Sequence, residues 1–247
     1  MHSKDYPASR KRKRPKVESI TDYKHQKEFF AEPESTKYRV LYPKNENQKK
    51  YLESLEKNTI TIAVGCPGTA KTLLALYYGF LLVQARQINK IYYIKPNVGS
   101  KWERDIGATP GELQEKLSDI VLDPVKDNLP CFMTRGEMEY HLNKGTIEPK
   151  LFANIRGETF RDCLAILDEA QNIPPEAVKT FLTRLGTNCK MVICGDELQQ
   201  DVNLPRNGLT DVVGRLKNLS DVGIVRFTRE DIVRNGLIKQ ILERYED

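Results

Sequence analysis

The chain of 247 residues lacks any apolar run near the roughly 20 residues that cross a bilayer. Its N-terminal stretch is basic and polar, so we expect no secretory signal peptide there. The three histidines are scattered, and the five cysteines include no C-x-x-C pair. These absences argue against a zinc site and against a disulfide framework. We therefore expect a cytoplasmic protein with free thiols.

Positive charge is concentrated near one end of the chain. The formal net charge is +5, yet the segment RKRKRPK at residues 10–16 alone carries six basic residues and no acid. The remainder is therefore close to neutral. Such a run repels itself and can bind nucleic-acid phosphates without sequence specificity. A solubilising tail with no specific partner explains the run equally well.

The chain divides into an extension and one domain. Residues 1–37 lack sustained apolar periodicity, so we expect a basic, disordered extension. Over residues 38–247, short apolar runs alternate with longer helical patterns, which predicts an α/β fold with a mostly parallel sheet between helices. The predicted strands cover residues 59–64, 90–95, 163–170, 190–196 and 222–227.

The segment GCPGTAKT follows the first predicted strand and opens a predicted helix. It matches the phosphate-binding pattern G-x-x-x-x-G-K-[ST] except at one position. Backbone N–H groups of such a loop, together with the helix N-terminus, attract phosphate oxygens. Lys71 would reach the β- and γ-phosphates of ATP, and Thr72 would ligate Mg²⁺. The predicted nucleotide-binding residues are Gly65, Cys66, Pro67, Gly68, Thr69, Ala70, Lys71 and Thr72.

The exception is Ala70, where the pattern has glycine. We expect alanine to be tolerated there, because the residue before Lys71 enters the helix and ordinary helical angles should suffice. Replacing Ala70 by glycine should then change nucleotide affinity little.

Two further predicted strands end in polar residues. LAILDEAQN places Asp168 and Glu169 at the carboxyl end of a strand, the edge where ligands of parallel sheets bind. Asp168 would hold Mg²⁺, and Glu169 would orient and deprotonate the attacking water. In MVICGDELQQ the predicted strand ends at Asp196, and Asp196 together with Gln199 or Gln200 could sense the γ-phosphate.

Together these motifs resemble those of superfamily 1 helicases, and more closely those of the PhoH family of cytoplasmic P-loop ATPases. The similarity runs from about residue 42 to 245 and includes YPKNENQKKYL, TPGELQEK, FANIRGETFRDCLAILDEAQN and EDIVRNGLIKQILERYE. The resemblance implies a RecA-like P-loop NTPase fold that binds ATP. It assigns Gln48 to the adenine edge, Gln199 to the γ-phosphate and Arg234 to the late-motif arginine.

The resemblance implies an ATPase linked to nucleic acid, with RNA favoured over DNA. One RecA-like domain leaves a γ-phosphate open on one side, so we expect a homo-oligomeric ring, such as a hexamer, in which Arg184 or Arg234 acts as an arginine finger. A nucleotide-gated binding protein with little turnover and a small-molecule kinase remain alternatives. Candidate phosphate-backbone contacts are Lys95, Asn97, Lys101 and Arg104. Trp102 could stack on a base, although we favour packing in the protein.

Overall fold

A computed structural model describes residues 38–96, 121–199, 202, 204–234 and 244 of the chain. The basic extension at 1–37, the segment 97–120 and Gln200 lie outside the described residues. The principal elements are α2 (Glu46–Lys57), β1 (Ile60–Gly65), α3 (Lys71–Gln84), β2 (Lys90–Lys95), α5 (Arg135–Asn143), β3 (Ile147–Leu151), β4 (Cys163–Leu167), α6 (Pro175–Leu182), β5 (Cys189–Gly195), α7 (Gly208–Leu216) and β6 (Val222–Phe227).

The described strands form a six-stranded sheet in the order β3-β2-β4-β5-β1-β6, and every pairing is parallel. The α/β prediction is therefore confirmed, and the arrangement is consistent with a RecA-like P-loop domain. Because all strands run the same way, their carboxyl ends share one edge. The phosphate loop after β1 and the acidic pair after β4 consequently lie at the same edge, with β5 between their strands.

Strand β3 is absent from the predicted set of strands. It pairs only with β2 at the edge of the sheet, and its Pro149 stands opposite Tyr93. Proline cannot donate a ladder hydrogen bond, so it is tolerated only at the edge of a sheet. Its presence in a sequence argues against a strand, which is why β3 was not predicted. The alternation of Glu148 and Lys150 with apolar residues reflects the half-exposed position of an edge strand.

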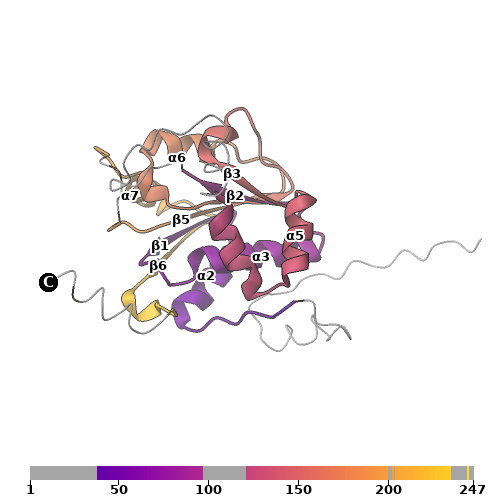
Figure 1. The fold of residues 1–247 in the computed structure, drawn as a ribbon. Helices are drawn as coiled ribbons and strands as arrows, with labels where there is room; N and C mark the ends of the chain where they lie inside the picture. The colour runs from indigo at the N-terminus through magenta and orange to yellow at the C-terminus, as the bar shows by residue number, and fades with distance from the viewer. Residues whose placement is uncertain (1–37, 97–120, 200–201, 203, 235–243, 245–247) are drawn as a thin grey trace, which may run out of the picture.

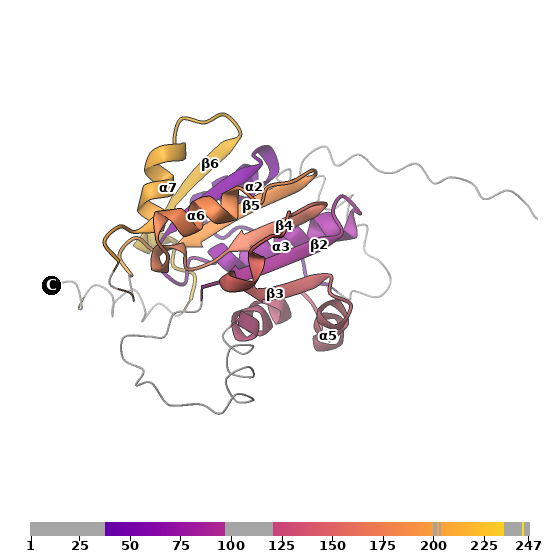
Figure 2. The same cartoon turned by 90° about the horizontal axis from the view of Figure 1, so that it is seen from above.

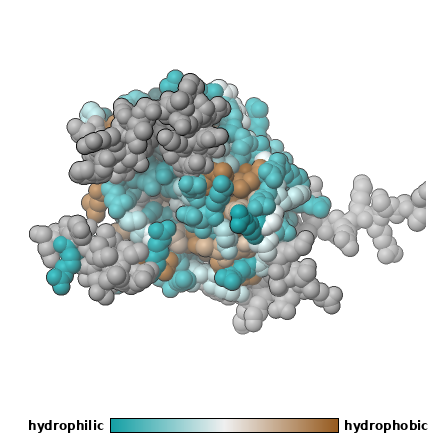
Figure 3. Space-filling model, viewed as in Figure 1, coloured by the Kyte–Doolittle hydropathy of each residue, from teal (hydrophilic) through white to brown (hydrophobic). Residues whose placement is uncertain are grey.

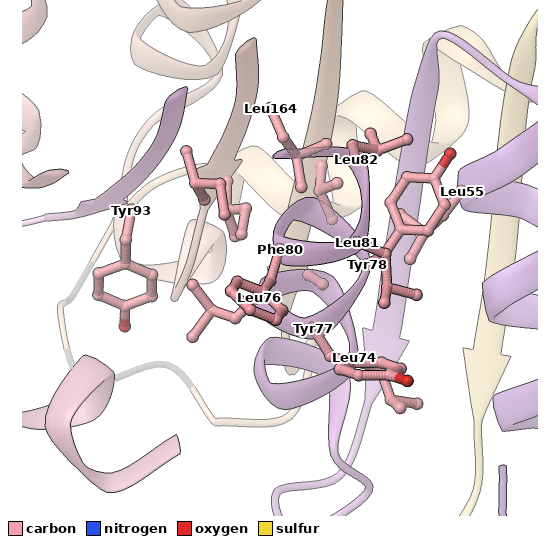
Figure 4. Packing of buried hydrophobic residues seen from close by; sticks show 14 of the residues in the cluster. Leu55, Leu74, Leu76, Tyr77, Tyr78, Phe80, Leu81, Leu82, Tyr93 and Leu164 are labelled. Atoms are coloured by element: carbon pink, nitrogen blue, oxygen red, sulfur yellow. The ribbon is translucent and has the colours of Figure 1, made fainter. Parts of the chain in front are cut away.

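Helices cover both faces of the sheet (Figures 1 and 2). Helices α2 and α3 lie on one face, with α5 beside β3, and α6 and α7 lie on the other. Each face has its own cluster of buried apolar side chains. Helix α3 is apolar on nearly all sides, as expected of a helix enclosed by protein. Figure 4 shows its leucine and aromatic side chains packing against the sheet and against α2.

Hydrophilic residues predominate on the face drawn in Figure 3, with smaller hydrophobic areas between them. Among the described helices, none combines the length and hydropathy required to cross a membrane.

Helix α2 approaches β6 closely, and Gly223 permits this approach. A Cβ atom on Gly223 would lie 1.9 Å from Ser54 Oγ and 2.6 Å from Asn58 Nδ2. Ser54 is already held at 3.1 Å from the hydroxyl of Thr61 on β1. The spacing between α2 and the sheet therefore depends on the missing side chain of Gly223.

We expect Gly223→Ala to destabilise the protein by about 1–3 kcal/mol, because a methyl group there overpacks a tight contact. Gly214→Ala is the matched control, since a Cβ at this α7 position meets no atom within 4 Å. Its higher helix propensity should stabilise the protein by up to about 1 kcal/mol. Free energies of unfolding from denaturant titration test both variants. Equal effects of the two substitutions would contradict the close approach.

Candidate nucleotide-binding site

The phosphate loop passes close to the end of β6. Gly65 has φ 139°, and a Cβ there would lie 2.2 Å from the carbonyl oxygen of Phe227. Gly68 also has a positive φ, of 81°. These backbone conformations favour glycine, so the two glycines of the sequence pattern stand where the turn requires them.

Ala70 also adopts a left-handed conformation, with φ 68° and ψ 25°. The expectation that ordinary helical angles suffice at this position is wrong. Ala70 is the N-cap of α3, and its carbonyl oxygen accepts the first helical hydrogen bond from Leu74 N at 3.0 Å. A left-handed conformation costs an L-residue about 1–2 kcal/mol. The left-handed backbone therefore explains why the general pattern has glycine at this position. Alanine occupies it here at the cost of backbone strain.

Lys71 folds back over the loop. Its Nζ donates hydrogen bonds to the carbonyl oxygens of Gly65 at 2.5 Å and Cys66 at 2.8 Å, and to Thr69 Oγ1 at 3.3 Å. Thr69 Oγ1 in turn donates to the carbonyl oxygen of Cys66 at 2.9 Å. The ammonium group thus lies inside the curve of the loop, with only 9% of the residue exposed. This position puts a positive charge within the loop that the sequence pattern predicts to bind phosphate.

The loop and the end of β4 meet through Thr72 and Asp168. Thr72 Oγ1 donates a hydrogen bond to Asp168 Oδ2 at 2.8 Å. The two residues predicted to hold Mg²⁺, which are 96 positions apart in sequence, therefore present their oxygens side by side. Asp168 is 9% exposed.

The hydroxyl and the carboxylate of this pair are oxygen donors of the kind that Mg²⁺ uses. Within the described ranges, no group of three or more His, Cys, Asp or Glu side chains could hold a metal ion. Mg²⁺ prefers oxygen ligands and commonly uses one or two protein groups together with substrate phosphates. One hydroxyl and one carboxylate beside a phosphate loop match that donor set.

Glu169 follows directly and also adopts a left-handed backbone, with φ 55° and ψ 40°. Its Oε2 accepts a hydrogen bond from Gln171 Nε2 at 2.6 Å. Burial and then the charge of Asp168 raise the pKa of Glu169, although Gln171, Lys95 and Lys71 act in the opposite direction. Backbone strain combined with a raised carboxyl pKa is typical of functional groups.

Gln171 links Glu169 to the end of β5. Its Oε1 accepts a hydrogen bond from Asp196 N at 3.1 Å, and the residue is 1% exposed. A Cβ on Gly195 would lie 2.4 Å from the same oxygen, so this glycine makes room for the contact. The sequence analysis did not single out Gln171. Its position two residues after Glu169, in a motif that ends a buried strand, was the available signal.

The predicted γ-phosphate sensor lies on an exposed turn. Gln199 is exposed, and its N–H donates to the carbonyl oxygen of Asp196 at 3.3 Å. Asp196 is buried, and its Oδ1 accepts a hydrogen bond from Leu198 N at 3.0 Å. Gln200, the alternative sensor, lies outside the described residues. The turn therefore begins at the site edge, and the sensor role of Gln199 stays a prediction.

The NENQ segment contacts both the phosphate loop and Asp231 after β6. Gln48, which is 2% exposed, donates from Nε2 to the carbonyl oxygen of Thr69 at 3.2 Å and accepts from Lys44 N at 2.8 Å. Asn47 Nδ2 donates to Asp231 Oδ2 at 2.8 Å. In this arrangement Gln48 supports the phosphate loop, and its predicted contact with adenine stays untested.

Asp231 is a second residue that the sequence analysis missed. It closes a capping box with Thr228, whose N–H donates to Asp231 Oδ2 at 2.7 Å. The T-x-x-D spacing before the late motif was a visible signal for such a cap. Two residues beyond Asp231, Val233 N donates to the carbonyl oxygen of Gly68 at 3.0 Å. The cap therefore directs the chain across the phosphate loop.

The two candidate arginine fingers lie in different places. Arg234 is exposed and rests on the loop, with its Cδ 3.4 Å from the position a Cβ would take on Gly68. Arg184 follows α6, and its carbonyl oxygen accepts a hydrogen bond from Phe160 N at 2.9 Å, just before β4 begins. Arg184 therefore lies at the amino edge of the sheet, a strand length away from the loop of its own chain.

Lys95 ends β2 at the carboxyl edge, and its charge lowers the pKa of Glu169. It was predicted to contact a nucleic-acid backbone, and that contact stays a prediction. The other predicted contacts, Asn97, Lys101, Trp102 and Arg104, lie outside the described residues.

Comparison with known proteins identifies the family of the chain. The profile of the family described as PhoH-like protein matches residues 40–246 of the chain. The chain belongs to the PhoH-like family. This assignment confirms the resemblance inferred from the motifs, and it covers both the phosphate loop and the segment that crosses it.

Relatives of this PhoH-like chain occur in several bacteria. The PhoH-like protein of Mycobacterium tuberculosis (strain ATCC 25618 / H37Rv) is 37% identical over 214 residues, covering 85% of this chain and 59% of that protein. The PhoH-like protein of Bacillus subtilis (strain 168) is 33% identical over 232 residues, covering 90% and 71%. Protein PhoH of Escherichia coli (strain K12) is 35% identical over 210 residues, covering 83% and 58%. The chain thus spans less than two thirds of the length of some of these relatives.

Ala70→Gly should stabilise the folded protein by about 1 kcal/mol, because glycine relieves the left-handed strain despite its larger entropy when unfolded. Ala85→Gly is the matched control at the other end of α3, where φ is −73° and no such strain exists. The free energy of unfolding of that variant should be lower than that of the wild type by about 0.5–1 kcal/mol. Thermal or chemical denaturation measures both. A loss of stability in Ala70→Gly similar to that in Ala85→Gly would show that the left-handed conformation is not retained in solution.

Proposed function

We propose that this PhoH-like chain binds ATP with Mg²⁺ and hydrolyses it. The observation that carries the proposal is the 2.8 Å contact between Thr72 at the end of the phosphate loop and Asp168 at the end of β4. It brings a phosphate-binding segment and a carboxylate together, with Glu169 as the next residue.

In the proposed mechanism, the loop N–H groups and the start of α3 bind the phosphates. Lys71 Nζ exchanges its carbonyl contacts for β- and γ-phosphate oxygens. Thr72 and Asp168 would hold Mg²⁺, which when bound neutralises phosphate charge in the transition state. Glu169 orients the attacking water and accepts its proton, a role suited to a carboxyl whose pKa burial raises. Gln171 holds the same carboxyl and connects it to the turn that carries Gln199.

Two other functions use the same loop. A nucleotide-gated binding protein would bind ATP with little turnover, and a small-molecule kinase would pass the phosphoryl group to a second substrate. The position of Glu169 beside the Thr72–Asp168 pair supports hydrolysis, because a carboxylate next to the proposed Mg²⁺ ligands could act as the base for an attacking water. All three functions predict nucleotide binding, so turnover and its acceptor separate them.

The proposed partner of the ATPase cycle is nucleic acid, with RNA favoured over DNA. This link rests on the resemblance to superfamily 1 helicases and on the six basic residues at 10–16. Basic runs of this kind supply salt-dependent, non-specific affinity for phosphate backbones. Coupling of nucleic-acid binding to turnover would be read as stimulation of hydrolysis by RNA.

The proposed active form is a head-to-tail homo-oligomeric ring, because such an interface repeats one complete site in every subunit. Arg184 lies at the edge of the sheet opposite its own phosphate loop, so it could act as a finger only on a neighbouring subunit. Arg234 rests on the loop of its own chain, so it would act within the chain. The two arginines therefore make different predictions in mixed oligomers.

Steady-state ATP hydrolysis, measured with and without RNA, tests the proposed function. Lys71→Ala should abolish nucleotide binding or turnover. Glu169→Gln should still bind ATP, with turnover reduced by about 10²-fold or more, a usual general-base contribution. The pH dependence of wild-type turnover is a separate test of Glu169. Turnover should fall as the pH drops through the pKa of Glu169, which lies above the usual 4.5 because of burial. This acid limb should vanish in Glu169→Gln.

Wild-type turnover in a folded Glu169→Gln variant would contradict the assignment of the base. ATP binding without turnover in the wild-type protein would favour the gated binding protein. Phosphoryl transfer to a small acceptor, with no free phosphate released, would favour the kinase.

Mixed oligomers test which arginine acts between subunits. Glu169→Gln subunits mixed with Arg184→Ala subunits should regain hydrolysis, because an intact Arg184 can reach a neighbouring site with an intact Glu169. Glu169→Gln mixed with Arg234→Ala is the matched control and should regain none. Recovery in the control alone would reverse the two roles, and full activity of a monomer at nanomolar concentration would rule out the shared site.

A further inference from the structure

Tyr93 lies beneath the proposed magnesium site. It belongs to β2, is 0% exposed and packs within the apolar cluster on the face covered by α3 (Figure 4). Its hydroxyl group donates a hydrogen bond to Asp168 Oδ2 at 3.0 Å. A polar group this deeply buried requires a partner, and the carboxylate at the end of the neighbouring strand provides one.

Four hydrogen bonds hold Asp168 in place. Its Oδ2 accepts hydrogen bonds from Thr72 Oγ1 at 2.8 Å as well as from Tyr93. Its Oδ1 accepts one from Glu169 N at 3.1 Å. Its own N–H donates to the carbonyl oxygen of Ile94 at 2.9 Å. Strand β2 therefore holds both the backbone and the side chain of Asp168.

The two hydroxyl donors to Oδ2 differ in what they can do. Thr72 stands at the loop, where its hydroxyl is also the predicted ligand of Mg²⁺. Tyr93 approaches from the protein interior. Its ring is packed in the apolar cluster, so its hydroxyl group is held in position. A tyrosine hydroxyl carries its proton at neutral pH, so Tyr93 can act as the hydrogen-bond donor to Oδ2.

We propose that Tyr93 is a positioning residue that holds the Asp168 carboxylate in the orientation needed for Mg²⁺ and the nucleotide. The inference rests on the proposed function and extends it to a residue outside the phosphate loop and the acidic motif. If Thr72 Oγ1 were to leave Asp168 for a bound metal ion, the Tyr93 hydroxyl would still hold Oδ2. Partners of this kind, which orient a metal ligand without touching the metal, commonly contribute 10–100-fold in metal affinity or activity.

The experiment measures binding of a fluorescent ATP analogue to the full-length chain as Mg²⁺ is titrated. Tyr93→Phe removes one oxygen and keeps the ring. Its half-saturating Mg²⁺ concentration should rise about tenfold, while nucleotide affinity without Mg²⁺ should change less than twofold. Tyr78→Phe is the matched control, since Tyr78 is a similarly buried tyrosine of α3 near Glu56, and its Mg²⁺ dependence should equal that of the wild type.

A double-mutant cycle separates positioning from a general loss of packing. In an Asp168→Asn background, Tyr93→Phe should cause no further change in the Mg²⁺ titration, because its effect passes through that carboxylate. Thermal unfolding of each variant shows that the compared proteins are folded.

An unchanged Mg²⁺ dependence in Tyr93→Phe would overturn the proposal. So would an equal shift in Tyr78→Phe, or a full additional shift in the Asp168→Asn background. Failure of the proposed function itself would give a different result. The wild-type protein would then show no Mg²⁺-dependent nucleotide binding, whatever the behaviour of the variants.

Discussion

The hydrogen bond between Thr72 and Asp168 joins two segments that are 96 residues apart, and the rest of the site is arranged around it. It depends on a parallel sheet, since only parallel strands bring the ends of β1 and β4 to one edge. Neighbouring elements hold the two segments in place. Helix α3 continues from the loop, Tyr93 of β2 donates a hydrogen bond to Asp168, and Gln171 accepts one from Asp196 at the end of β5.

The two ends of the described chain also meet at this edge. Asn47, just inside α2, contacts Asp231, and Val233 then reaches the carbonyl oxygen of Gly68. These contacts place a segment near residue 231 across a loop that begins at residue 65. The phosphate loop is therefore held from both sides, by Gln48 and by the late motif, which gives a physical reason for the two motifs to occur in one domain.

Much of this arrangement could be predicted from the sequence because its signals are local. The strands around Ile62, Ile94 and Ile166 are continuous apolar runs, and the loop and acidic motifs follow such runs directly. What the sequence did not predict depends on partners far along the chain. Edge strand β3 contains a proline that only its position in the sheet makes acceptable. The left-handed backbone of Ala70 follows from the turn that carries it, and the hydroxyl of Tyr93 acquires a role only when β4 lies beside β2.

A structure of the protein with a non-hydrolysable ATP analogue and Mg²⁺ tests the central claim most directly. The account predicts that the phosphates lie along residues 65–72, with Lys71 Nζ released from the Gly65 and Cys66 carbonyl oxygens and bonded to the β- and γ-phosphates. It also predicts a metal ion between the γ-phosphate, Thr72 Oγ1 and Asp168. A nucleotide bound away from this loop, or bound with Lys71 still on its carbonyl partners and no metal beside Thr72, would contradict the account.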